Sequence, residues 1–144
     1  MEVKMRAYFF QNFYLQGIHA GIQSQHTTAE MFVKYSDQPN YNNVLFEWAS
    51  KHKTTIVLNG GMQKDLLEIV NVLEDLPYPF AYFREEQDAL NGAVTNVGVI
   101  LPEVVYVAPR TSDAVEFGMY CAEYDLSDEV MDFIVLLQSK RLMN

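Results

Sequence analysis

The feature that most constrains the fold of this chain is an alternation of short apolar segments with longer amphipathic ones. The short segments are rich in β-branched and aromatic residues and are bounded by turn residues, which is typical of buried strands. They are Met5–Phe10, Thr54–Leu58, Pro79–Arg84 and Val94–Leu101, with Thr54–Leu58 expected in the sheet interior. Strands that alternate with helices favour a largely parallel sheet covered on both faces. We therefore expect a three-layer α/β/α domain around a mixed, mainly parallel four-stranded sheet.

Helical periodicity predicts the segments that would cover this sheet. Ile18–Tyr35 is expected to bury a stripe that contains Ile18, Ile22 and Val33, and a second helix would run from Asn40 through Trp48. A third helix is expected from Met62 to Leu76. In the last helix Ser127 is the predicted N-cap, and the apolar stripe consists of Val130, Phe133, Ile134 and Leu137.

The segment Glu103–Asp125 lies between the fourth strand and the last helix. We interpret it as an insertion in which Val104–Val107 and Glu116–Tyr120 form short strands, joined by a turn at residues 109–112. Such a hairpin would expose an edge that suits a second copy of the chain or another partner.

The bulk composition is that of one folded domain spanning residues 1–144. The hydrophobic fraction is 49%, far above that of disordered chains. Cys121 is the only cysteine, so no intramolecular disulfide can form. No stretch resembles a signal-peptide core or reaches the length of a membrane span. We expect a cytoplasmic protein that does not contact the membrane.

The charge balance bears on the class of partner. Ten Lys and Arg residues stand against nineteen Asp and Glu residues, which gives a formal net charge of −9. Proteins that bind nucleic acid usually present a basic face, because neutralising phosphates releases counterions. The charge therefore disfavours tRNA as a partner and favours a protein or a small ligand.

Three stretches of the chain, read in order, match one known family. They are Gln23-Ser-Gln-His26, then Phe46-Glu-Trp48 followed by Thr54–Leu58, and finally Lys64–Leu76, Pro79–Arg84, Gly92-Ala-Val-Thr95 and Gly98. In this order and spacing the chain resembles the second class of peptidyl-tRNA hydrolases, found in archaea and eukaryotes. The resemblance leaves Glu103–Asp125 unmatched. In its small size and acidity the chain is also similar to uncharacterised tailed-phage proteins.

The resemblance implies a set of catalytic and binding positions. The family's lysine falls on His19, or on Gln16 if the loop is shifted, its aspartate on Glu85, and its loop threonines on Ala89 and Thr95. His19, Glu85 and Thr95 are then the candidate catalytic residues. The candidate binding residues are Gln23, His26 and Arg84. No metal ligand and no cofactor is implied.

The departures from the family pattern affect the chemistry directly. Cleavage of an ester requires stabilisation of the developing oxyanion and orientation of water. A histidine replaces the permanently charged lysine, and an imidazole supplies a positive charge only when it is protonated. Two hypotheses follow: a degenerate site with a binding or regulatory role, or an active hydrolase of peptidyl-tRNA or a related acyl ester. Formation of a homodimer is compatible with both hypotheses.

Overall fold

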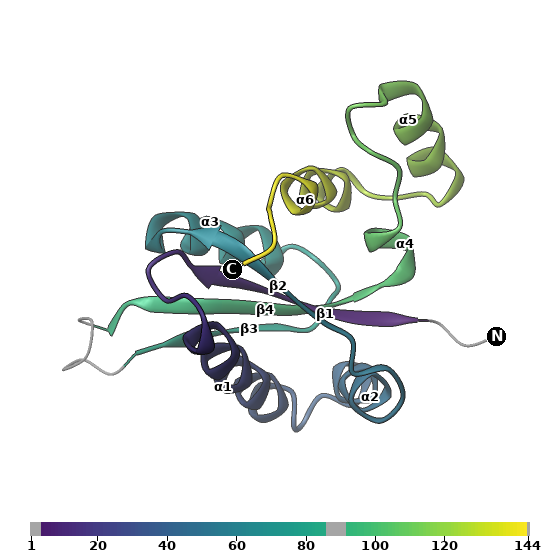
Figure 1. The fold of residues 1–144 in the computed structure, drawn as a ribbon. Coiled ribbons are helices and arrows are strands. Elements are labelled where there is room, and N and C mark those ends of the chain that lie inside the picture. Colours follow the sequence, from purple (N-terminus) through teal and green to yellow (C-terminus); the bar gives the residue numbers. More distant parts are fainter. Residues whose placement is uncertain (1–3, 86–91, 144) are drawn as a thin grey trace.

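The centre of the fold is a four-stranded sheet with the strand order β2-β1-β4-β3 (Figure 1). The computed structural model describes residues 4–85 and 92–143. The strands are β1 Met5–Asn12, β2 Thr55–Gly61, β3 Phe80–Arg84 and β4 Val94–Pro102. The α-helices are α1 Ile18–Lys34, α2 Pro39–Glu47, α3 Gln63–Glu74, α4 Glu103–Tyr106, α5 Ala114–Glu123 and α6 Asp128–Gln138. Within the described ranges no helix is long and apolar enough to cross a bilayer.

The sheet is mixed, but the expectation that it is mainly parallel is wrong. Only β1 and β2 pair in parallel, whereas β4 runs antiparallel to both β1 and β3. Strands β3 and β4 follow each other in the chain and pair directly, which requires no crossover helix between them.

The position of β2 also differs from the prediction, because it forms an edge of the sheet and not its interior. The C-terminal residues cover its outer side. The Asn59 N–H donates to the Arg141 carbonyl at 2.8 Å, and the Met143 N–H donates to the Val57 carbonyl at 2.9 Å. The β-branched residues of β2 are therefore protected by a terminal segment in place of another strand.

Helices pack against both faces of the sheet. Figure 1 shows α1 and α2 on one face, and α3 and α6 on the other. Alternate residues of β1 divide between the two cores, with Phe9 facing Met31 and Leu45 while Phe10 faces Leu66 and Phe133. The last helix confirms its prediction: Ser127 Oγ accepts the Val130 N–H at 3.2 Å, and the four residues of the predicted stripe are buried.

The buried face of α1 is not the predicted apolar stripe. Ile18 and Val33 are 76% and 71% exposed, whereas Ala20, Gln23, Ser24, Thr27 and Met31 face the sheet. Small and polar side chains are needed here because α1 lies close to β4. A Cβ added at Gly98 would stand 2.6 Å from the Phe9 ring and 2.9 Å from Thr27 Cγ2. Gly98 thus permits the close packing of α1 on the sheet.

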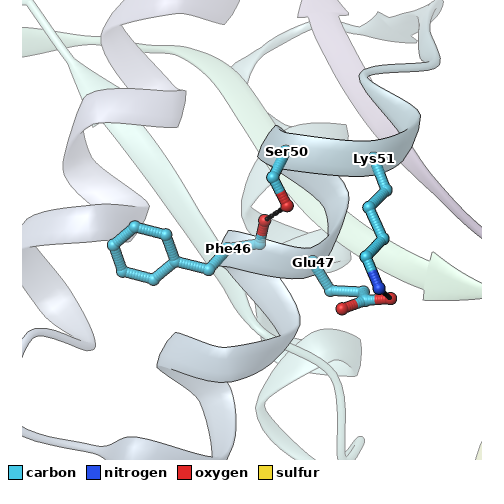
Figure 2. Close-up of polar contacts among 4 residues, drawn as sticks. All are labelled: Phe46, Glu47, Ser50 and Lys51. Atoms are coloured by element: carbon cyan, nitrogen blue, oxygen red, sulfur yellow. Dashed lines mark hydrogen bonds and ion pairs between the residues drawn. The ribbon is translucent and has the colours of Figure 1, made fainter.

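A π-helical turn, Trp48–His52, continues α2 and returns the chain to β2. Figure 2 shows two contacts across this junction: the Ser50 hydroxyl donates to the Phe46 carbonyl at 2.6 Å, and Lys51 pairs with Glu47 at 3.1 Å. Trp48 Nε1 then donates to the Thr54 carbonyl at 2.9 Å. The Phe46 and Thr54 carbonyls thereby accept hydrogen bonds from side chains at the end of the helix.

The segment Glu103–Asp125 contains helices α4 and α5, so the prediction of two short strands is wrong. The Asp113 side chain accepts the Glu116 N–H at 3.3 Å and caps α5. Phe117, Tyr120 and Cys121 follow helical spacing and face inward, and the Tyr120 hydroxyl donates to the Val104 carbonyl at 2.7 Å. A period of three to four residues is incompatible with a strand, whose buried positions alternate.

We expect Gly98→Ala to lower the free energy of unfolding by about 1–3 kcal/mol, because its methyl group would push Phe9 and Thr27 apart. Gly21→Ala on α1 is the matched control, since nothing lies within 4 Å of the added Cβ. That change should stabilise the protein by about 0.5–1 kcal/mol through helix propensity. Urea denaturation monitors both, and equal stability of the two variants would contradict the close packing of α1 on β4.

Candidate functional site

A β-bulge determines which side chains of β4 reach α1. Phe83 pairs with Asn96 and Arg84 pairs with Val94, so Thr95 is the extra residue on β4. Both Thr95 and Asn96 bond to side chains of α1, whereas Val94 belongs to the core on the other face. Bulges commonly redirect a side chain in this way next to functional sites.

Thr95, Gln23 and Glu85 form a continuous hydrogen-bonded chain. The Thr95 hydroxyl donates to Gln23 Oε1 at 3.0 Å, and Gln23 Nε2 donates to Glu85 Oε1 at 2.8 Å. Thr95 and Gln23 are buried, while Glu85 is partly exposed just after β3. The two bonds fix the orientation of the Gln23 amide, and they bring together three residues that the sequence predicted for the site.

His19, the third candidate catalytic residue, is not part of this hydrogen-bonded chain in the described structure. It is exposed on the first turn of α1, four residues before Gln23. In the described part of the structure its imidazole makes no hydrogen bond to Glu85 or Thr95, and its backbone N–H bonds to the Gln16 carbonyl at 3.3 Å. Gln16, the alternative position, donates through Nε2 to the Phe13 carbonyl at 3.1 Å.

The candidate binding residues His26 and Arg84 border the same region. The His26 ring packs at a tilt against Phe83, with centroids 4.5 Å apart. Arg84 Nη1 donates to the Gly92 carbonyl at 2.7 Å, where Gly92 has a φ of 71°. Both contacts are made within the chain itself, and both side chains are exposed to solvent. Ala89 lies outside the described residues.

A second buried polar network lies beside the first, and the sequence analysis did not identify it. Asn96 Nδ2 donates to Gln11 Oε1 at 2.8 Å and to Ser24 Oγ at 3.2 Å. Gln11 and Asn96 have no exposed surface. The network is only partly satisfied, because Gln11 Nε2 and Asn96 Oδ1 have no hydrogen-bond partner among the described residues, whereas most buried polar groups in proteins are paired. Polar residues within otherwise apolar strands were the available signal in the sequence.

A cavity of about 580 Å³ opens next to Thr95. Its walls come from the β1–α1 loop, the start of α3 and the start of β4, and they consist of Asn12, Tyr14, Leu15, Met62, Gln63, Ala93 and Thr95. Gln63 Oε1 accepts the Val94 N–H at 3.1 Å, and Asn12 Oδ1 accepts the Tyr14 N–H at 3.0 Å, so two amide side chains brace the wall.

The lining of this cavity is mainly apolar, with a few polar groups. Tyr14, Leu15, Met62 and Ala93 offer apolar contact, and Gln63 places an amide side chain in the same wall. None of the lining residues carries a positive charge. A developing oxyanion on these walls would therefore be stabilised only by hydrogen-bond donors and not by a cation.

No three His, Cys, Asp or Glu side chains in residues 4–85 and 92–143 gather in a way that would hold a metal ion.

Comparison with known proteins assigns no relative: no protein-family model matches the chain, and no curated protein sequence matches it. The site is therefore interpreted from its own geometry and from the resemblance of its motifs.

We expect Thr95→Val to destabilise the protein by about 1–3 kcal/mol, because it leaves the buried Gln23 Oε1 without its donor. Thr28→Val is the matched control, since the Thr28 hydroxyl bonds only to the Ser24 carbonyl of its own helix. That change should alter stability by no more than about 0.5 kcal/mol. Thermal and urea unfolding measure both, and a Thr95→Val variant as stable as Thr28→Val would contradict the buried bond.

Proposed function

We propose that this chain is a divergent member of the class 2 peptidyl-tRNA hydrolase superfamily that binds a ligand or partner at the Thr95 cavity without hydrolysing it. In this proposal the domain has the three-layer α/β/α form of that superfamily, with Glu103–Asp125 as an insertion. The observation that carries the proposal is the hydrogen-bonded chain of Thr95, Gln23 and Glu85, which stands beside a cavity whose walls have no cation.

The order of the elements supports the superfamily assignment. The resemblance implies a helix that carries Gln23 and His26, a helix with Trp48 that leads into a strand, and then a helix, two strands and a final helix. The chain has α1, α2, β2, α3, β3, β4 and α6 in that order. Contacts between residues 62 positions apart, such as Gln23 and Glu85, bring the matched motifs into one place.

Three observations support a binding role over catalysis. Thr95 is 1% exposed and its hydroxyl is already donated to Gln23, so it is poorly placed to act on a substrate. His19, which replaces the family's lysine in the resemblance, is exposed and makes no hydrogen bond to Glu85 or Thr95 among the described residues. The net charge of −9 also opposes the approach of a polyanionic tRNA.

The alternative is an active hydrolase of peptidyl-tRNA or a related acyl ester. One observation favours it: Glu85 and Thr95, both predicted as catalytic, lie one side chain apart through Gln23. Here Gln23 would position Thr95, and protonated His19 would supply the missing positive charge when a substrate is bound.

Release of free tRNA from peptidyl-tRNA decides between the two. We expect the wild-type protein to release tRNA no faster than buffer does, because Thr95 is buried and its hydroxyl is already donated to Gln23. Thr95→Ala is measured beside it, with circular dichroism to verify that both fold. Turnover by the wild type that disappears in Thr95→Ala would overturn the binding proposal and establish the hydrolase.

Binding at the cavity is tested separately with N-acetyl-phenylalanine amide, which carries an apolar group and amide hydrogen-bonding groups. We expect its addition to shift the amide NMR signals of Ala93, Thr95 and Gln63. Ala93→Phe, which fills the cavity, should abolish these shifts, whereas Val33→Ser on the exposed side of α1 should not. The absence of shifts up to millimolar probe would place the binding role outside this cavity.

A further inference from the structure

Helix α5 presents apolar side chains to solvent although its other face is anchored. Phe117, Tyr120 and Cys121 face the protein, and the Tyr120 hydroxyl bonds to the Val104 carbonyl. Val115 and Met119, one helical turn apart, are 74% and 69% exposed. In Figure 1 α5 lies beyond α4 and α6, away from the sheet. The position of α5 therefore leaves this apolar pair accessible.

The exposed pair borders a groove of about 620 Å³, here called the α5 groove. Its lining combines apolar side chains with carboxylates: Pro109, Asp113, Val115, Glu116, Met119, Tyr120 and Glu123. Methionine adapts its shape readily to apolar partners, so Met119 suits a contact surface. The groove has the dimensions of a site that takes a few side chains of a partner segment.

The charges around the α5 groove are of one sign. Asp113, Glu116 and Glu123 line it, and no ion pair among the described residues neutralises them. Arg110 is the only basic residue between Glu103 and Asp125. The pKa of Tyr120 is raised, first by burial and then by neighbouring groups that include the carboxylates of Glu103 and Glu123, as expected in a negative field.

We propose that the α5 groove docks a cationic amphipathic helix of another protein. Apolar side chains of that helix would pack on Val115 and Met119, and its Lys or Arg residues would face Glu116 and Glu123. An amphipathic helix in an apolar groove is a common mode of recognition. Charge complementarity selects the occupant, because the acidic rim attracts a basic segment and repels both an acidic peptide and an anionic lipid surface.

A second copy of this chain fits the α5 groove less well. Each copy has a net charge of −9, and a symmetric contact would oppose the same three carboxylates. The proposal is also independent of the proposed function at Thr95. The two surfaces share no lining residue, so failure at one surface leaves the other unaffected.

The test uses a fluorescein-labelled helical peptide about five turns long, with leucines on one face and lysines on the other. Fluorescence anisotropy measures its affinity for the full-length protein, and amide NMR shifts locate it. We expect binding that weakens with salt and shifts confined to α5 and its neighbours. A peptide in which glutamates replace the lysines should not bind.

Two double variants and two matched controls test the contacts. We expect Val115→Ser with Met119→Ser, and separately Glu116→Gln with Glu123→Gln, to weaken peptide binding about tenfold or more. All four residues are exposed, so both variants should fold. Val33→Ser and Glu68→Gln, exposed on other helices, should bind as the wild type does.

Three results would overturn the proposal. One is affinity of the Val115→Ser, Met119→Ser variant equal to that of the wild type. Another is a set of NMR shifts spread over other acidic surfaces. The third is a dimer of the free protein, seen by sedimentation, that Met119→Ser abolishes, because this would assign the α5 groove to a second copy.

Discussion

The direct packing of α1 on β4 is the contact on which the candidate site depends. Gly98 removes the side chain that would separate them, and Thr27 and Phe9 occupy the space that a Cβ would need. Gln23 and Ser24 lie on the face of α1 that packs against the sheet. Their amide and hydroxyl groups then require partners, because an unpaired buried polar group costs about 1–3 kcal/mol. Thr95, Glu85 and Asn96 supply those partners.

The same contact determines which groups at the site are committed to internal hydrogen bonds. The bulge at Thr95 places its hydroxyl toward Gln23, where the bond fixes both groups. What remains accessible is the neighbouring cavity, with apolar walls and braced amides. The α5 groove is a second surface of different chemistry, lined by apolar side chains and by carboxylates. Under the two proposals, the Thr95 cavity holds a ligand or partner and the α5 groove holds a basic helix.

The sequence predicted those parts of the fold that depend on local pattern. The strands around Phe9, Val57 and Val97 and the helix capped by Ser127 were recognisable from periodicity and capping. The parallel-sheet expectation failed because strand direction depends on which strands pair, and pairing is decided by tertiary contacts. The stripe on α1 was misassigned for the same reason, since Gly98 favours small and polar residues on the helix face above it. Motif spacing identified Gln23, Glu85 and Thr95, whereas Gln11 and Asn96 gave only the weak signal of polarity in an apolar strand.

A double-mutant cycle between Gln23→Leu and Thr95→Val tests most directly whether the site is one hydrogen-bonded unit. Each single change leaves a buried partner unpaired, whereas the double change removes both groups. We expect the double variant to be more stable than the sum of the single losses implies, by about 1–2 kcal/mol. Strictly additive losses in urea unfolding would show that Gln23 and Thr95 act independently, and would contradict the hydrogen-bonded chain as the basis of the site.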